Sequence, residues 1–225
     1  FPVYKHSRMS VFTVNLGMWV YDSLSLFRSP KIHRKLSRKQ VAVEEPMLLR
    51  TDLKGAPLYY DCSTDDARLT LETALDAADH GAVILNHFRV EGLIHGTDGK
   101  TGGARVVDCV TGEKHEISAL SIINATGPWA DRTRALRGEE APPRLRPTKG
   151  IHLVVDVERL RVHNAVVCFH PEDGRVLFAI PWGDRTYVGT TDTDFSGDPG
   201  LVAADSADIQ YLLDAANHYF PEANL

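Results

Sequence analysis

The sequence has 225 residues, of which 43% are hydrophobic and 24% are charged, proportions that are ordinary for a soluble globular protein of one or two domains. Its formal net charge of −5 gives no support for nucleic-acid binding. The three cysteines form no CxxC pair and the ten histidines show no metal-ligand spacing, so we predict a reducing compartment without a metal site or a disulfide framework.

Residues 10–27 predict an apolar helix. One face of it carries Val11, Val14, Met18 and Tyr21. Further apolar residues widen this face almost all round: Phe12, Leu16, Trp19, Val20, Leu24 and Phe27. The segment is too short and too polar to span a membrane, which leaves two interpretations, a buried helix or a helix on a membrane surface or in a partner groove.

A basic segment follows this helix. Its cations are Arg28, Lys31, Arg34, Lys35, Arg38 and Lys39. Such a run is usually a solvated face, although beside an apolar helix it could also meet anionic lipid. Ser37 and Gln40 then resemble a capping box for a short helix that ends before Pro46.

The clearest helix covers residues 64–81. Thr64 or Asp65 can cap its start, and Gly81 stands where a C-terminal glycine belongs. Its apolar face consists of Ala67, Leu71, Ala74, Leu75 and Ala78. We expect it to feed a strand at 82–85.

A β-meander and a buried strand should follow. Residues 88–95 predict a strand, and residues 104–110 and 113–118 predict a hairpin across Thr111-Gly112. The apolar run 119–123 predicts a buried strand that breaks at Ala-Thr-Gly before a helix at 129–137. This strand–turn–helix geometry lets a backbone approach a bound phosphate or nucleotide, but it is also an ordinary connection in α/β proteins.

After Pro142-Pro143 the pattern becomes that of one antiparallel sheet. Strands are predicted at 148–155, 165–169, 176–180 and 186–189, with turns at 172–175 and 182–185. Ser206 can cap a final helix, 207–219. Its apolar face would hold Ile209, Leu212, Leu213 and Ala216.

Five blocks occur in an order and spacing that together identify a family resemblance. They are DCSTDDARL at 61–69, NATGPWA at 124–130, PTKGIH at 147–152, IPW at 180–182 and GTTDT at 189–193. The set resembles the FAD-dependent glycerol-3-phosphate dehydrogenases, within the D-amino-acid-oxidase-like flavoproteins. Each block alone is weak, but the resemblance covers nearly the whole chain.

The resemblance implies an α+β fold. An antiparallel substrate-domain sheet should accompany the middle part of a Rossmann-like FAD domain. The family begins with a strand, a GxGxxG turn and a helix that hold the flavin diphosphate, and this sequence contains no GxGxxG. We therefore expect an internal fragment in which the first βαβ unit is absent. Residues 1–60 should form a helical entry and part of the substrate domain. Residues 61–141 should form the middle strands and helix of the FAD domain. Residues 142–225 should form the substrate-binding sheet and the helix after it.

For the full-length enzyme the resemblance implies oxidation of sn-glycerol 3-phosphate to dihydroxyacetone phosphate. The C2 hydride would pass to the flavin N5, and the electrons to a membrane quinone. Alternatives are a glycerol-3-phosphate oxidase that uses oxygen and a non-catalytic binding module. We expect a cytoplasmic protein, with peripheral contact to the cytoplasmic membrane as an open question. The 225-residue chain alone should hold no FAD and be inert.

The resemblance also suggests site residues. For the flavin they are Arg89 and Val90 near adenine, and Ala125, Thr126 and Gly127 near ribose and pyrophosphate. Plain strand-end packing is the alternative for these five.

On the substrate side the first choice is Lys149, because alternation along 148–155 places it on one face with Ile151 and Leu153, where a lysine is costly to bury without a partner. A lysine whose amine reaches solvent is the alternative. Further candidates, equally compatible with a capped turn, are Thr190, Thr191 and Asp192.

Overall fold

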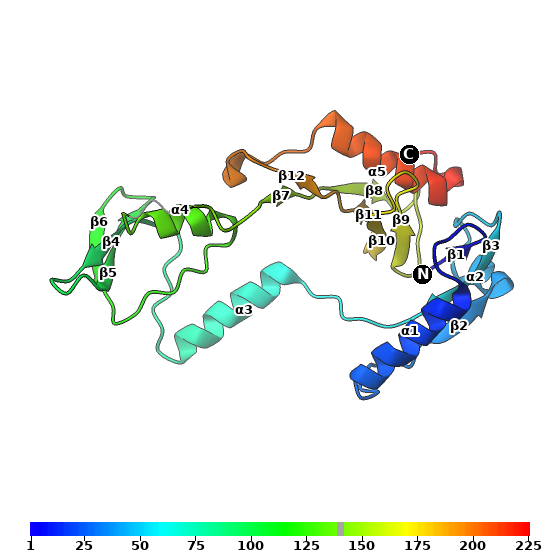
Figure 1. Cartoon of the computed structure of the whole chain (residues 1–225), viewed down its shortest axis with the longest axis horizontal. Coiled ribbons are helices and arrows are strands. Elements are labelled where there is room, and N and C mark those ends of the chain that lie inside the picture. The colour runs from blue at the N-terminus through cyan, green and yellow to red at the C-terminus, as the bar shows by residue number, and fades with distance from the viewer. Residues whose placement is uncertain (139–141) are drawn as a thin grey trace. The chain divides into compact units, whose positions relative to one another are not determined.

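Two units make up the part of the chain that the computed structural model describes, which comprises residues 1–138 and 142–225 (Figure 1). The first unit contains Phe1–Cys62, Thr148–Asp194 and Val202–Leu225. The second contains Ser63–Pro147 and Phe195–Leu201. Each unit is described by itself below.

A four-stranded antiparallel sheet forms the centre of the first unit. Its strand order is β8-β11-β10-β9, with β8 at His152–Asp156, β9 at Val166–Phe169, β10 at Val176–Trp182 and β11 at Arg185–Gly189. Trp182 pairs with Arg185, so the β10–β11 hairpin turns through two residues, and Gly183 takes the positive φ of 58° that this tight turn needs. The predicted antiparallel sheet is therefore present.

The predicted strand 148–155 is divided in two. β7 (Thr148–Lys149) pairs with β12 (Thr193–Asp194), and β8 begins only at His152. Thr190 lies so close to Gly150 that a Cβ atom there would stand 2.5 Å from the Thr190 hydroxyl oxygen. The chain thus changes partner at Gly150, where only a glycine fits this close approach.

Helix α5 (Ser206–Tyr219) packs on the sheet (Figure 1). Its buried face, which includes Leu212, Ala215 and Ala216, joins the core of the unit. The sheet side of this core includes Leu177, Ala179 and Val188, and Leu160 joins it from the connection between β8 and β9. The predicted cap was wrong by one residue: Asp205 caps the helix and forms a capping box with Asp208, while Ser206 is already helical.

The remaining elements of the first unit form a smaller sheet with two helices. The sheet has the order β1-β3-β2, from β1 (Val3–Tyr4), β2 (Arg34–Ser37) and β3 (Leu53–Leu58). Helix α2 (Arg38–Glu44) begins with the predicted Ser37–Gln40 capping box, which is confirmed. A short 3₁₀ helix, η3 (Pro221–Ala223), follows α5.

Helix α1 (Val11–Leu24) is capped by Ser10, so the predicted helix is confirmed. Its burial is not that of a core helix, because the described chain buries only Val14 and Asp22. Large apolar side chains remain exposed along it: Phe12, Leu16, Trp19, Val20 and Leu24. The described residues therefore supply no partner that would bury this helix.

The second unit contains a three-stranded antiparallel sheet of order β4-β5-β6. β4 is Phe88–His95, β5 is Thr101–Asp108 and β6 is Lys114–Ser118. The hairpin turn at Gly112, which has a φ of 79°, is confirmed. Helix α3 (Asp66–Asp79) is capped by Asp65 and is followed by Gly81 with a φ of 89°. The unit also contains η1 (Gly127–Trp129), α4 (Ala130–Ala135) and η2 (Pro199–Leu201).

Two strand predictions in this unit were wrong. Residues 82–85 and 119–123 are described as irregular chain, and Leu120 and Ile123 are 103% and 88% exposed. A buried strand needs hydrogen-bonded neighbours and cover on both faces, and the described residues supply neither for these segments. Helix α3 likewise buries none of its residues. The apolar patterns are those of buried elements, but their packing partners are not among the described residues.

Candidate functional site

Lys149, at the end of β7, lies between two carboxylates of the first unit. Its Nζ is 2.8 Å from Asp205 Oδ2 and 2.6 Å from Asp208 Oδ2. The lysine side chain is 11% exposed and that of Asp208 is 4% exposed. Hydrogen bonds to Asp205 and then Asp208 raise the pKa of Lys149 above its ordinary value. The amine therefore remains an ammonium ion and does not serve as a proton acceptor.

The two aspartates were not recognised from the sequence. They lie at the start of α5, more than fifty residues from Lys149, and only folding brings them together. The hydrogen bond from Lys149, followed by that from the Asp208 backbone, lowers the pKa of Asp205. The Asp-x-x-Asp pattern at a helix start was the available signal, since it marks a capping box with carboxylates left to bind a cation.

The segment Thr190–Asp192 lies beside this lysine. Thr191 is 3% exposed, and its Oγ1 accepts a hydrogen bond from Ile151 N at 3.0 Å and donates to the Lys149 carbonyl at 3.3 Å. Thr190 donates to the Thr191 carbonyl. Asp192 is exposed. The Thr191 hydroxyl thus holds the backbone at the β7–β8 break, while the Asp192 carboxylate is accessible.

An aromatic row lies on the exposed side of the four-stranded sheet β8-β11-β10-β9. The His152 ring packs edge-on against Tyr187 with centroids 5.5 Å apart, and Tyr187 packs against Trp182 at 5.2 Å. His152 also covers Gly189 so closely that a Cβ atom there would stand 2.2 Å from the imidazole. The glycine before Thr190 therefore makes room for this ring.

The first pair of flavin candidates lies on β4 of the second unit. The Arg89 guanidinium donates to Glu91 Oε1 at 3.0 Å, and this bond is the main cause that raises the pKa of Arg89. Val90 is 41% exposed and pairs with Val106. Both candidates are accessible from solvent.

The second cluster, Ala125–Gly127, is an exposed turn held by Asn124. The Asn124 amide donates to the Ala130 carbonyl at 2.8 Å and accepts from the Thr126 hydroxyl at 2.8 Å. Gly127 has a φ of 52°, and a Cβ atom there would meet nothing within 4 Å. The turn is thus fixed by side-chain hydrogen bonds, while its backbone stays open to a close approach.

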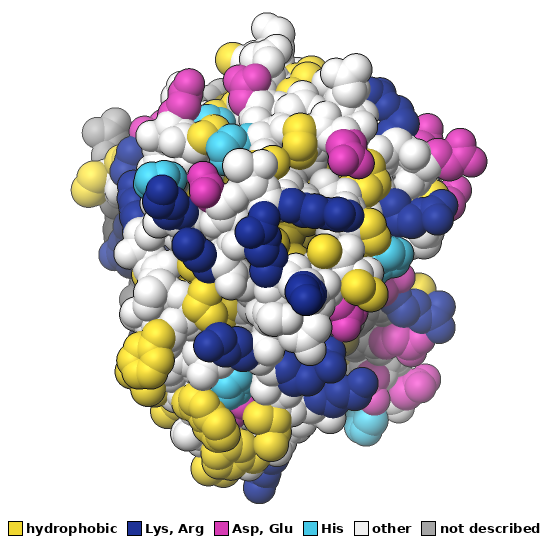
Figure 2. All heavy atoms as spheres, turned by 90° about the vertical axis from the view of Figure 1, so that its right-hand side faces the viewer, with side chains coloured by type: hydrophobic (Ala, Val, Ile, Leu, Met, Phe, Trp, Pro, Cys, Tyr) yellow, Lys and Arg dark blue, Asp and Glu magenta, His cyan; other side chains and the backbone are white. Residues whose placement is uncertain are grey.

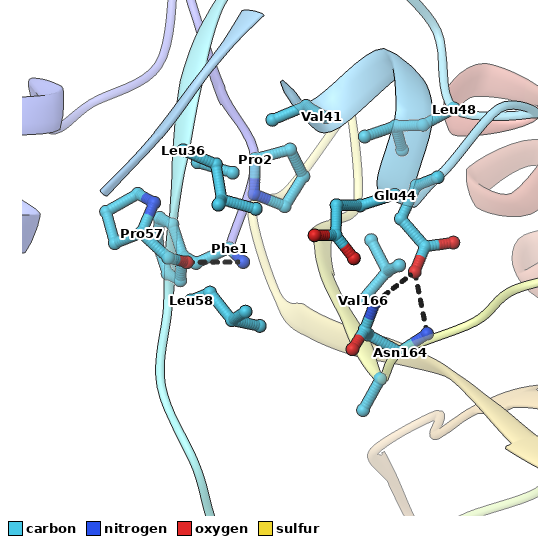
Figure 3. A pocket seen from close by; sticks show the side chains of 13 residues that line it. Phe1, Pro2, Leu36, Val41, Glu44, Leu48, Pro57, Leu58, Asn164 and Val166 are labelled. Atoms are coloured by element: carbon cyan, nitrogen blue, oxygen red, sulfur yellow. Dashed lines mark hydrogen bonds between the residues drawn. The ribbon is translucent and has the colours of Figure 1, made fainter. Parts of the chain in front are cut away.

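A small hollow in the first unit does not suit an anion (Figure 3). Most of its lining is apolar, including Leu36, Val41 and Leu58, and its charged side chains are Glu44 and Glu45. Glu45 accepts hydrogen bonds from the backbone N–H and the side-chain amide of Asn164 at 2.6 and 2.8 Å. No lysine or arginine is among the residues that line it, so these carboxylates would repel a phosphate.

Neither a metal cluster nor a membrane span is found in the described ranges. Residues 1–138 and 142–225 bring together no group of three metal-ligating side chains. In the same ranges, no helix is both long enough and apolar enough to cross a membrane.

Residues 18–225 match the family described as "FAD dependent oxidoreductase", and the chain belongs to this family of flavoproteins. It is 39% identical over its whole length to the aerobic glycerol-3-phosphate dehydrogenase of Staphylococcus haemolyticus (strain JCSC1435), of which it covers 40%. It is 38% identical, again over its whole length, to the alpha-glycerophosphate oxidase of Enterococcus casseliflavus, of which it covers 38%.

One solved structure agrees with this assignment, and a more distant one shares the fold alone. The glycerol-3-phosphate dehydrogenase of Bacillus halodurans, complexed with FAD, superimposes with a TM-score of 0.82 and 41% identity, over 85% of this chain and 38% of that one. L-proline dehydrogenase from P. horikoshii, 16% identical, covers 97% of this chain and 55% of that one with a TM-score of 0.70, a likeness of fold alone. The family resemblance is confirmed, and the mixed fold resembles that of a FAD-dependent oxidoreductase. The chain spans about 40% of the length of the curated relatives it matches.

Proposed function

We propose that the full-length protein oxidises sn-glycerol 3-phosphate to dihydroxyacetone phosphate with FAD as its cofactor. The observation that carries this proposal is that dehydrogenases and an oxidase named for glycerol phosphate match the whole of this chain at 35–39% identity. Bound FAD supplies the acceptor for the hydride of the alcohol carbon. The protein's part is to bind and orient the substrate and the cofactor.

The substrate side would use the polar residues beside the β7–β12 pair of the first unit. Lys149 offers a permanent positive charge, since its carboxylate partners keep it protonated. Asp205 is 59% exposed, so a substrate phosphate could replace it beside the ammonium ion while the buried Asp208 stays in place. Thr190 and Asp192 would line the same edge, and Thr191 would hold the backbone there.

The flavin side would use the second unit. The open turn Ala125–Gly127 offers backbone for the ribose and pyrophosphate, and Arg89 with Val90 offers a strand surface for the adenine. We assign 61–141, which contains most of the second unit, to the FAD domain. We assign 1–60 and 142–225 to the substrate domain, although residues 142–147 and 195–201 of this range lie in the second unit. The remaining contacts to the cofactor would come from outside these residues.

For the electron acceptor we propose a membrane quinone, with the protein peripheral on the cytoplasmic membrane. Phe12, Leu16, Val20 and Leu24 recur every fourth residue along α1 and are 54–81% exposed. Figure 2 shows hydrophobic side chains gathered at the lower edge of the face it displays, with lysine and arginine side chains near them. Exposed apolar side chains followed by a run of cations would favour contact with anionic lipid.

The turn after α1 supports this interpretation. Leu26 and Phe27 are 69% and 52% exposed, and both adopt a positive φ, of 53° and 55°. That conformation is unfavourable for residues other than glycine. The turn therefore exposes two apolar side chains to solvent at a conformational cost. An apolar environment would offset this cost. Oxygen as acceptor is the second candidate, favoured by the match to the oxidase of Enterococcus casseliflavus.

The membrane contact is tested by sedimentation of the full-length protein with anionic vesicles. Replacing Phe12 and Trp19 by Ser should release it without unfolding, because each apolar side chain contributes about 1.5–3 kcal/mol on burial. If the variant unfolds, and does not merely lose its binding to vesicles, α1 packs within the protein.

The reaction is tested with the purified full-length protein, sn-glycerol 3-phosphate and either a quinone analogue or oxygen. We expect dihydroxyacetone phosphate to form with the quinone analogue and without hydrogen peroxide. If oxygen supports the reaction and hydrogen peroxide forms in proportion to dihydroxyacetone phosphate, the electron acceptor is oxygen and the quinone assignment is wrong. Lack of product with both acceptors would refute the proposed substrate.

A further inference from the structure

A second group of polar side chains in the first unit converges on the segment Thr190–Asp192. At its centre is Asp173, in the turn between β9 and β10. The Tyr211 hydroxyl oxygen, from α5, lies 3.1 Å from each Asp173 carboxylate oxygen, so its one proton makes a hydrogen bond shared between them. The Tyr211 ring stacks on His170, with centroids 3.8 Å apart and planes within 1° of parallel. The stack fixes the tyrosine, and the tyrosine fixes the carboxylate.

Asp173 in turn orients Arg175. Its Oδ1 accepts the Arg175 backbone N–H at 3.0 Å, and its Oδ2 lies 3.4 Å from Arg175 Nε. The Arg175 Nη1 then donates to the backbone carbonyl of Asp192. A continuous chain of contacts thus runs from α5 through Asp173 and Arg175 to the residue that exposes its carboxylate beside the candidate substrate site.

The same segment is tied to α5 from its other end. The Thr191 hydroxyl bonds to the Lys149 carbonyl, and the Lys149 ammonium bonds to Asp205 and Asp208 at the start of the helix. Helix α5 therefore holds Thr190–Asp192 from two sides through separate side-chain links.

The exposure of the group argues against a purely stabilising role. The side chains of Asp173 and Arg175 are 40% and 50% exposed. Ion pairs at such positions contribute little to stability, so the arrangement is better explained by the geometry it imposes on its neighbour.

We propose that Tyr211, Asp173 and Arg175 are positioning residues, which fix the Asp192 backbone so that the polar edge Thr190–Asp192 meets the substrate in one conformation. This inference rests on the proposed oxidation of glycerol 3-phosphate. It adds three residues, from α5 and the β9–β10 turn, to the machinery of that site.

The test uses the full-length protein with Tyr211→Phe, Arg175→Lys and the double variant. Tyr211→Phe keeps the ring stacked on His170 and removes only the hydroxyl. We expect each single variant to raise the KM for sn-glycerol 3-phosphate roughly three- to tenfold, the range for loss of one hydrogen bond, with kcat changed less than twofold. Because both act through Asp173, the double variant should raise the KM no further than the larger single effect.

Tyr219→Phe is the matched control. It removes another hydroxyl from the same helix, one that accepts the Phe169 backbone N–H at 3.1 Å, and it should lower the melting temperature while the KM stays unchanged. An unchanged KM in Tyr211→Phe, or a double variant whose KM effect is the product of the two single effects, would overturn the inference.

Hydrogen exchange separates this inference from the proposed function. In Tyr211→Phe the amides of residues 190–194 should exchange faster than in wild type, whereas in Tyr219→Phe they should not. Unchanged exchange there would overturn the positioning chain whatever the substrate. A wild-type protein that fails to oxidise sn-glycerol 3-phosphate would instead overturn the proposed function.

Discussion

Replacement of Leu212 by Ala should destabilise the first unit by about 3 kcal/mol. Leu212 is 0% exposed and belongs to the core that joins α5 to the sheet. The substitution removes three carbon atoms, worth about 0.8 kcal/mol each in transfer free energy, and leaves a cavity that adds to this loss. Because α5 carries the carboxylates that bind Lys149, loosening it should also disturb the candidate site.

Ile209→Ala is the matched comparison on the same helix. Ile209 is 39% exposed, so a smaller part of its side chain leaves water on folding and no closed cavity results. Alanine also has the higher helix propensity, by a few tenths of a kcal/mol. We therefore expect a cost of about 1 kcal/mol or less.

Urea unfolding followed by far-ultraviolet circular dichroism measures both values. The two variants should keep the wild-type slope and differ in midpoint, with Leu212→Ala unfolding first. Equal midpoints for the two variants would refute the assignment of Leu212 to the buried face of α5.

Three further predictions concern single groups. Burial raises the pKa of the Cys168 thiol to about 12. Iodoacetamide should therefore label Cys168 in the full-length protein only after denaturant is added. Labelling of Cys168 itself at neutral pH without denaturant would contradict this. Asp131 accepts the backbone N–H groups of Arg144 and Leu145 at 2.8 and 2.9 Å, so Asp131→Ala should speed hydrogen exchange of both amides while leaving those of β5 unchanged. The pKa of Asp205 lies below its ordinary value of 3.8. Its ion pair with Lys149 therefore stabilises the fold at pH values above 3.8, and this stabilisation is lost as the pH falls through the lowered pKa. Carboxyl ¹³C titration should give a midpoint below 3.8, and Lys149→Met should move it upward.

Local patterns predicted the helices, and they predicted the strands whose hydrogen-bonded neighbours lie within the described chain. Alternation and turn residues located the strands of the β8-β11-β10-β9 sheet, and the Ser37–Gln40 pattern located the start of α2. Segments 82–85 and 119–123 have the apolar composition of strands but not the neighbours, and a strand without hydrogen-bonded neighbours is not formed by composition alone.

The candidate site shows a related limit. Lys149 was singled out because a lysine on an apolar face needs a partner, and the structure supplies two carboxylates. The identity of those partners depends on how α5 packs, which no local pattern encodes. The same holds for Tyr211 and Asp173, which are 38 residues apart and meet only in the folded unit. The roles proposed for the residues of both sites stay predictions.

The central claim, that this chain is part of a flavoenzyme which oxidises glycerol 3-phosphate, is tested most directly by anaerobic reduction of the full-length protein. The purified protein, mixed with sn-glycerol 3-phosphate in the absence of oxygen, should lose its oxidised flavin absorbance stoichiometrically and release dihydroxyacetone phosphate. Glycerol, which lacks the phosphate, should leave the absorbance unchanged. A flavin that is bleached equally by both compounds, or by neither, would contradict the account.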